Sequence, residues 1–433
     1  MTGRRLAGVA IAVLVLATLT GCPATEHRAE PTPTPSRASA SASGEEPRPA
    51  LATRASTDRP AYGGPPAGAP PSLGPLTLLH ATVDLTPATP TVFSVPAAAA
   101  ATPDGRVLVA LRPVDSSPPR LATVSPDGAV TGAVDLPPFT DLADLHVLPD
   151  GRAVVVGALG PVDDAAGGYG LAVVDPATGQ ARTTVAVRFD RTVVIPYGRS
   201  AVSADGSRAY LFVTSIGRRQ EFPEQLVAID LDTGQVVGRR AVTDDIARVS
   251  VFPAKFEAAG LESRPGGGAS LLLDASPVAA RLERLPTLLP FDADLNPAGD
   301  PVRLTDLAEG AETQAVTTSA DGTVFVVVEV RDGDWVLAVP DGGGAGPVLA
   351  QFPDPAHDYA LEVEPAQEWA LLPSLGGVRA IDLRTGEQPP PLDLGCAGGL
   401  HVRGIVPTAA GAAVFGECGA VAQRTALLWL VGP

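Results

Sequence analysis

The chain has 433 residues, enough for two or three ordinary domains. Its 48 Asp and Glu residues outnumber its 31 Lys and Arg residues, so its formal net charge is −17. Such an acidic chain lacks the basic stripe that nucleic-acid binding requires, and we expect no nucleic-acid partner.

The first 21 residues have the pattern of an export signal. Arg4 and Arg5 precede an apolar run over residues 6–19, and small residues follow at Thr20-Gly21. A charged start, a short apolar core and a small-residue break are typical of a secretory signal peptide. The run is shorter than the roughly 20 residues that a membrane-spanning helix needs.

A lipid anchor is expected directly after this signal. The residues Leu19-Thr20-Gly21-Cys22 resemble the lipobox of bacterial lipoproteins. In that family the Cys receives diacylglycerol, the signal is cut before it, and the new N-terminus is usually acylated. The resemblance implies that Cys22 is lipidated and that the protein is extracytoplasmic, anchored to the cell membrane. An ordinary cleaved signal with an incidental Cys is the alternative.

Residues 22–75 have the composition of a linker. Pro, Ala, Ser, Thr and Gly dominate, as in Pro31-Thr32-Pro33-Thr34-Pro35. Such a segment buries too little apolar surface to offset its ordering entropy, so we predict a disordered stalk. Its reach would be about 40 Å as a flexible coil.

A repeated turn-and-strand pattern fills residues 76–433. Turns of the Asp-Gly kind, or degenerate copies of them, precede short apolar strands at residues 103–105, 149–151, 204–206, 265–267, 320–322, 365–367 and 409–411. Several units carry a second turn such as Thr178-Gly179 or Thr233-Gly234. These turns supply the positive φ that tight hairpins need. The pattern predicts an all-β β-propeller of seven four-stranded blades, with six or eight blades as alternatives because the fourth unit is degenerate.

The units resemble those of bacterial YVTN-type and WD-like propellers, in which an apolar strand ends in Asp and runs into a Thr-Gly turn. Trp-Asp pairs are absent. The last unit ends after three strands, and the segment Leu76 to Leu85 has no unit of its own. We therefore predict that this segment supplies the missing outer strand and closes the ring.

The long irregular segments predict the binding face. In the topology that the resemblance implies, the short turns lie on one face. Residues 157–170, 214–224, 242–260 and 275–286 lie on the other face, and long loops concentrate binding sites. The candidate contact residues on that face are Tyr169, Arg218, Arg219, Phe222, Phe252 and Phe256.

Cys396 and Cys418 are predicted to form a disulfide. If Cys22 is lipidated, these two are an even pair in an oxidising compartment. Both belong to loops on the same face of the last blade. Closing a loop of this size would stabilise the fold by about 3 kcal/mol. Two free thiols are the alternative.

Groups for catalysis are scarce. There is no Gly-x-Ser-x-Gly elbow, and no phosphate-cradling motif. His146, His357 and His401 are expected near the starts of inner strands that line the channel, whereas His27 lies in the stalk and His80 in the closing strand. The segment 292–296 opens like a calcium loop, but Pro297 and Arg303 stand where such a loop needs Gly and Glu. We interpret this segment as a hairpin turn and expect no cofactor.

Two functions follow from these features, and a sensor or assembly factor is a third alternative. The first is a membrane-tethered extracytoplasmic binding or scaffold module that recognises an envelope protein, a peptide or a glycan. The alternative is a metal-dependent hydrolase or a lactonase-like propeller enzyme that uses His146, His357 and His401. The missing catalytic set favours the non-enzymatic module, whose ligand and oligomeric state the sequence leaves unknown.

Overall fold

The computed structural model describes most of residues 76–432. The ranges outside the description are 1–75, 89–93, 114–116, 137–138, 160–167, 188–198, 214–224, 243–244, 246–253, 278–284, 305–311, 319–321, 331–332, 340–347, 353–361, 364–368, 375, 383–387, 397–398, 421–423 and 433. All described residues belong to one compact unit, Ala55–Pro433. No helix in the described ranges is long and apolar enough to cross a bilayer.

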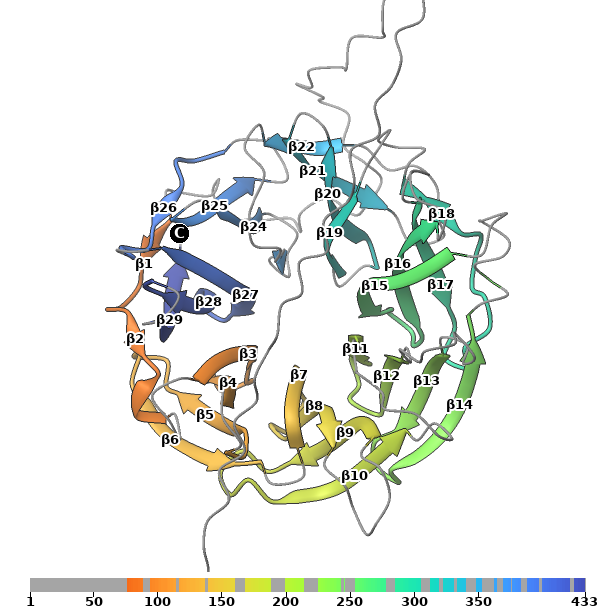
Figure 1. The fold of residues 1–433 in the computed structure, drawn as a ribbon, viewed down its shortest axis with the longest axis horizontal. Coiled ribbons are helices and arrows are strands. Elements are labelled where there is room, and N and C mark those ends of the chain that lie inside the picture. Colours follow the sequence, from red (N-terminus) through yellow and green to blue (C-terminus); the bar gives the residue numbers. More distant parts are fainter. Residues whose placement is uncertain are drawn as a thin grey trace, which may run out of the picture. The chain divides into compact units, whose positions relative to one another are not determined.

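The described strands form seven antiparallel sheets arranged in a ring (Figure 1). In a propeller the axis of this ring is the central channel. Each sheet is one blade, numbered here in chain order, and its first strand is the innermost. Consecutive strands within a blade pair with each other, which is the connectivity of a β-propeller. The fold class and the blade number predicted from the turns are therefore confirmed.

The first three blades contain four strands each. Blade 1 consists of β3 (Ser94–Ala101), β4 (Val107–Pro113), β5 (Arg120–Val124) and β6 (Val130–Asp135). Blade 2 consists of β7 (Phe139–Val147), β8 (Ala153–Leu159), β9 (Gly168–Val174) and β10 (Ala181–Val187). Blade 3 consists of β11 (Arg199–Val202), β12 (Arg208–Val213), β13 (Gln225–Asp230) and β14 (Gln235–Ala241).

The next three blades repeat this arrangement. Blade 4 consists of β15 (Ala254–Ser263), β16 (Ala269–Pro277), β17 (Leu285–Phe291) and β18 (Val302–Arg303). Blade 5 consists of β19 (Glu312–Thr318), β20 (Val324–Val330), β21 (Gly333–Val339) and β22 (Val348–Phe352). Blade 6 consists of β23 (Glu362–Val363), β24 (Trp369–Ser374), β25 (Gly377–Asp382) and β26 (Leu392–Asp393).

Blade 7 joins the two ends of the described chain. Its strands β27 (Leu400–Thr408), β28 (Gly411–Cys418) and β29 (Thr425–Gly432) are C-terminal. The short strands β1 (Thr77–Leu78) and β2 (Val83–Asp84) both pair with β29 along its outer edge. A 3-10 turn, η1 (Thr86–Ala88), then leads toward blade 1. The predicted closure of the ring by residues 76–85 is confirmed.

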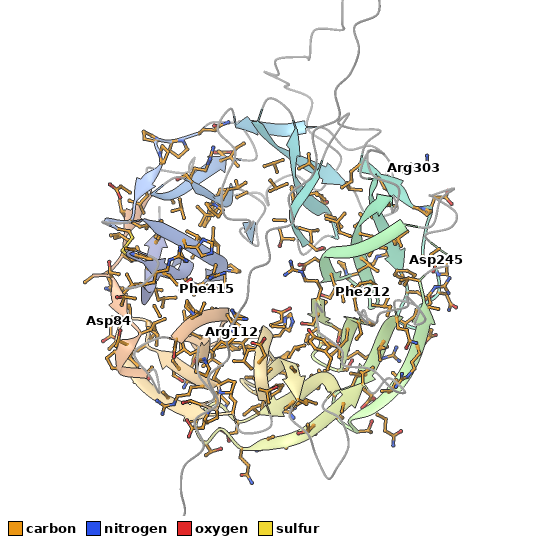
Figure 2. All side chains as sticks on the ribbon, viewed as in Figure 1. Asp84, Arg112, Phe212, Asp245, Arg303 and Phe415 are labelled. Atoms are coloured by element: carbon orange, nitrogen blue, oxygen red, sulfur yellow. A yellow bond between two sulfur atoms is a disulfide. The ribbon has the colours of Figure 1, made fainter. Side chains whose placement is uncertain are left out.

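The core is divided among the gaps between blades. Each of seven clusters of buried apolar side chains combines residues from two neighbouring blades. Figure 2 shows Phe212 and Phe415 toward the inner side of the ring, and Asp84 and Asp245 toward its outer rim. Both Phe side chains belong to clusters between neighbouring blades. Strand side chains alternate between the two faces of a sheet, so each blade supplies apolar residues to both of its neighbours. The blades are therefore held together mainly by apolar packing.

Three of the four predicted irregular segments, 157–170, 242–260 and 275–286, are partly strand. Within 242–260 the structure forms the first half of β15, and within 275–286 it forms the ends of β16 and β17. The pairing of β15 with β16 continues to Ala254 and Pro277. Pairing with neighbouring strands thus extends the strands into segments whose sequence pattern is irregular.

Gly157 and Gly170 were predicted to bound a loop and are instead paired strand residues of β8 and β9. A Cβ atom at Gly157 would lie 2.1 Å from the Asp141 carbonyl oxygen. A Cβ atom at Gly170 would lie 2.0 Å from the Val185 carbonyl oxygen. These glycines allow a close approach of neighbouring backbone.

Two local predictions are confirmed. Cys396 and Cys418 form a disulfide with a Cα–Cα distance of 5.6 Å. The segment Asp292 to Asn296 is the turn between β17 and β18, where Asp292 Oδ1 accepts hydrogen bonds from the backbone N–H of Asp294 and Asn296. The carboxylate is engaged within its own turn, as in an Asx-turn.

Candidate functional site

Five of the seven inner strands, as described, contain a β-bulge that sets the direction of their side chains. The pairing register shifts between Pro96 and Ala98 in β3, between Leu142 and Asp144 in β7, and at matching points in β15, β19 and β27. A bulge inserts one residue and re-aims the residues after it. In β7, Asp144 and His146 follow the bulge and are two residues apart, so both point toward blade 3.

Ser200 of blade 3 bridges these two side chains. Its hydroxyl donates to Asp144 Oδ2 at 2.6 Å and lies 2.8 Å from His146 Nε2. His146 Nε2 is also 3.4 Å from Asp144 Oδ2. Ser200 is buried, with 4% exposed, whereas the side chains of His146 and Asp144 keep 25% and 30% of their surface exposed. We call Asp144, His146 and Ser200 the polar bridge.

The polar bridge departs from the pattern of the other blades. Ser200 pairs with Leu211 and lies three residues before Ser203, where the turn into the second strand of its blade begins. The residues at the same register position in the other inner strands whose side chains are described are Ala99, Leu145, Leu261, Val316 and Ile405. All of them are apolar. A polar residue that interrupts an apolar repeat position is more often functional than accidental.

The hydrogen bonds of the polar bridge define the proton positions. A serine hydroxyl has one proton, and here Ser200 donates it to Asp144. Ser200 Oγ therefore accepts from His146, so the neutral imidazole carries its proton on Nε2. Nδ1 is then an unprotonated acceptor, and the bonds of the bridge do not use it.

The pKa values in the bridge shift in opposite directions. Burial lowers the pKa of His146, but the negative charges of Asp144 and Glu262 and the hydrogen bond with Asp144 outweigh it, so the pKa lies above its usual value. Burial raises the pKa of Asp144, but the His146 ring and the hydrogen bonds from His146, Ser200 and the Leu145 N–H hold it below its usual value. Asp144 is therefore ionised at neutral pH.

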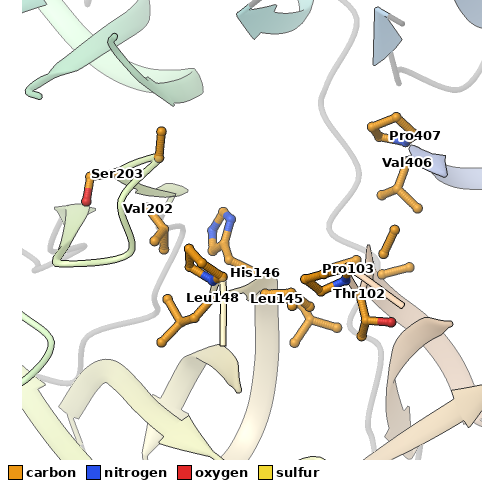
Figure 3. A pocket seen from close by; sticks show the side chains of 15 residues that line it. Thr102, Pro103, Leu145, His146, Leu148, Val202, Ser203, Val406 and Pro407 are labelled. Atoms are coloured by element: carbon orange, nitrogen blue, oxygen red, sulfur yellow. The ribbon is translucent and has the colours of Figure 1, made fainter. Parts of the chain in front are cut away.

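A pocket opens above His146 at the end of the channel where the Asp-Gly turns lie. Its cavity volume is about 500 Å³, within the range typical of small-molecule sites. Blades 7, 1, 2 and 3 line it with residues 99–103, 145–149, 202–204 and 406–407. Figure 3 shows the imidazole of His146 standing in the open space between these segments.

The pocket wall is mostly apolar. Ala, Val, Leu and Pro side chains dominate it, with the hydroxyl groups of Thr102 and Ser203 near the turns. Among the described lining residues, His146 is the one with an ionisable side chain. An apolar pocket with one oriented polar group is the usual design of a binding site.

Turn residues near the pocket carry charges that are neutralised locally. Arg106 Nε lies 2.8 Å from Asp104 Oδ2, and Arg152 Nε lies 2.6 Å from Asp150 Oδ2. The hydrogen bond from Arg106 lowers the pKa of Asp104 to about 2. These pairs brace the turns and leave no free cation among the described turn residues that line the pocket.

The structure corrects the prediction for Tyr169. Its side chain is fully buried in β9 within the core between blades 2 and 3. Burial raises the pKa of its phenol above the usual value. Tyr169 is a core residue and not a loop contact, because β9 begins at Gly168 and its alternation turns Tyr169 inward. Arg218, Arg219, Phe222 and Phe252 lie outside the described residues, as does the side chain of Phe256.

The predicted histidines do not converge. His401 lies near the start of β27, as expected, but His146 lies near the end of β7. The two are thus at opposite ends of the channel, and His357 lies outside the described residues. Within the described ranges, no three His, Cys, Asp or Glu side chains are close enough to hold a metal ion. His80 lies in the bend between β1 and β2.

The predicted binding face and the pocket are on opposite faces. The sequence pattern predicts binding at the long loops, whereas the pocket lies beside the short Asp-Gly turns. Aligning the residues before these turns would have singled out Ser200 and the Asp-Leu-His sequence at residues 144–146. The connection from Ser200 to His146 depends on the bulge, which has no signal in a single sequence.

Comparisons with known proteins support the fold. No protein-family model matches the chain, and no curated protein matches it. The propeller is similar to hydrazine synthase from Kuenenia stuttgartiensis, with a TM-score of 0.53 and 14% identity over 77% of this chain and 95% of that chain. It is also similar to oligogalacturonate lyase from Vibrio parahaemolyticus, with a TM-score of 0.51 and 12% identity over 83% of this chain and 98% of that chain.

A puromycin hydrolase is a third similar structure, with a TM-score of 0.51 and 16% identity over 83% of this chain and 55% of that chain. At these identities the likeness concerns the fold alone. The chain is a seven-bladed β-propeller, and its similarity to YVTN-type and WD-like units remains one of pattern.

Proposed function

We propose that this protein is an exported, membrane-tethered binding module whose propeller captures a ligand in the pocket above His146. The signal pattern and the lipobox-like residues before Cys22 support export and anchoring. The disulfide between Cys396 and Cys418 fits an oxidising, extracytoplasmic compartment. The observation that carries the binding role is the apolar pocket with one oriented imidazole.

The geometry of the polar bridge favours binding over hydrolysis. In Ser-His-carboxylate triads, serine and carboxylate bond to opposite nitrogens of the imidazole ring, so that a proton can be drawn from the serine. Here Ser200 and Asp144 both contact Nε2, and Ser200 directs its proton to Asp144. Ser200 is also buried. The bridge therefore orients His146 and does not activate a nucleophile.

Ligand capture tests the binding role. The mature full-length chain would be purified from its own membrane, and the small molecules or peptides that co-purify would be identified by mass spectrometry. Ala204→Trp places a large side chain on an exposed residue of the pocket rim. Ala177→Trp is the matched control, because Ala177 is an exposed turn residue that does not line the pocket.

We expect a ligand that accompanies the wild-type chain and the Ala177→Trp variant and is lost from Ala204→Trp. Equal ligand content in all three proteins would contradict the pocket as the binding site. Membrane fractionation of Cys22→Ser tests the anchor separately: we expect release from the membrane, and retention would contradict lipid anchoring.

A further inference from the structure

We infer that the pocket above His146 takes a primary ammonium group carried on an apolar stem. This inference rests on the proposed binding role and adds the chemical class of the ligand. It follows from three properties of the site: the acceptor on His146, the negative charge behind it and the apolar walls around it.

The first property is the proton arrangement of the polar bridge. Because Nε2 carries the proton of neutral His146, Nδ1 offers a lone pair. A ligand group that bonds to Nδ1 must therefore be a hydrogen-bond donor. An alcohol, an amide N–H and an ammonium meet this condition, whereas a carboxylate does not.

The second property is the sign of the electrostatic field. Asp144 is ionised, and its oxygens accept from the Leu145 N–H and the Ser200 hydroxyl, which carry no net charge to balance it. Glu262 of β15 adds a second negative charge that acts on His146, while β11 presents the neutral Ser200 and, beside it, Arg199. The positive charge of Arg199 acts on Tyr169, as the negative charge of Asp144 does. The nearby turn residues Arg106 and Arg152 are paired with Asp104 and Asp150. This field favours a cation among the possible donors.

The third property is the wall of the pocket. Ala100, Leu145, Val202 and Val406 present apolar surface around the imidazole. An ammonium ion alone would lose hydration there without replacing it, but an apolar stem gains free energy by leaving water. The ligand should thus combine a cationic end with an aliphatic or aromatic body.

Proton and ligand compete for Nδ1. Protonation of Nδ1 turns this acceptor into a donor, and a bound ammonium prevents that protonation. The apparent affinity should therefore fall as the pH drops through the pKa of His146. Once the protonated form predominates, the fall is about tenfold per pH unit, because only the neutral fraction binds.

Isothermal titration calorimetry with three probes of equal length tests this inference. Hexylamine supplies the ammonium, 1-hexanol a neutral donor and hexanoate an anion. With the mature full-length protein at pH 8, we expect hexylamine to bind at least about tenfold more tightly than hexanol, as for a hydrogen bond to a charged group. Hexanoate should bind most weakly, and hexylamine binding near pH 6 should release protons.

Variants identify the group responsible. His146→Leu should abolish the preference for hexylamine over hexanol, while His80→Leu, a matched change at an exposed residue of the closing segment, should leave it unchanged. Ser200→Ala is a second variant, which removes the hydrogen bond that orients the imidazole, and should weaken hexylamine binding with less change in packing. A preference that survives in both His146→Leu and Ser200→Ala would overturn the inference.

The outcomes separate the two proposals. Tighter binding of hexanoate or hexanol than of hexylamine would overturn the ammonium class but leave a pocket that binds, provided that Ala204→Trp abolishes it. Binding of none of the three probes to the wild-type chain would overturn the ammonium class, and equal ligand content in the capture experiment would overturn the binding role.

Discussion

The polar bridge can be replaced by the apolar residues that the repeat places elsewhere. Between blades 1 and 2 the corresponding positions hold Ala98, Ala100 and Leu145, all buried. The triple change Asp144→Ala, His146→Ala and Ser200→Leu copies that arrangement into the junction of blades 2 and 3. It tests whether the bridge exists for stability or for binding.

Two opposing effects set the expected stability. Ser200→Ala alone removes the hydroxyl that joins Asp144 to His146, and a hydrogen bond to a charged group contributes about 1.5–3 kcal/mol. Because water reaches the partly exposed Asp144 and His146 side chains, we expect a loss of about 1–2 kcal/mol in the free energy of unfolding. In the triple variant the three side chains of the bridge are removed together, so none of them is left without its partner, and only the Leu145 N–H loses its bond to Asp144. A buried Leu contributes about 1.5–3 kcal/mol.

We therefore expect the triple variant to match the wild type within about 1 kcal/mol and to exceed Ser200→Ala in stability. Urea unfolding followed by tryptophan fluorescence measures the free energies, and calorimetry with hexylamine measures binding. The triple variant should be stable and should bind hexylamine no more tightly than hexanol. A triple variant less stable than Ser200→Ala would refute the reasoning, because the bridge would then be a structural requirement of this junction.

Three further predictions follow. Gly170→Ala should destabilise the fold by at least about 2 kcal/mol, because the new Cβ would meet backbone. Gly132 has open space around it, so Gly132→Ala should change the stability by less than about 1 kcal/mol. The midpoints of urea unfolding distinguish the two variants. Reduction of the disulfide between Cys396 and Cys418 should cost about 3 kcal/mol, and equal thermal melts with and without reductant would contradict this. His146 has a raised pKa in the folded state. Its stabilising contribution is therefore fully present below the pKa of the unfolded chain and is lost as the pH rises through the pKa of the folded protein. The stability difference between wild type and His146→Leu should shrink with increasing pH, and a constant difference would argue against this.

The turns made the fold predictable. Asp-Gly and Thr-Gly turns depend on a local property, the positive φ that Gly adopts. Residues such as Gly105 and Gly151 therefore predict hairpins from the local sequence alone. The closing strand could be predicted because the last unit has only three strands, and the disulfide because two cysteines remain when Cys22 is set aside.

The site was less predictable because it depends on register. A bulge at Ala143 reverses the alternation of β7 and brings Asp144 and His146 to the side of Ser200, more than fifty residues away in sequence. Tyr169 was misassigned for a related reason: a strand that begins earlier than its composition suggests turns the side chain into the core. Pairing between strands decides both outcomes, and pairing is not local.

The closure of the ring also constrains the order of events in folding. Thr77 and Gly432 are joined by a hydrogen bond across a sequence separation of 355 residues, and β1 and β2 pair with β29, the last strand. The segment that is synthesised first among the described strands must wait unpaired until the last strand has been made. Such a non-local contact forms late and slowly. We therefore expect blade 7 to be completed late in folding, and a chain that stops before Thr425 would lack the strand with which β1 and β2 pair.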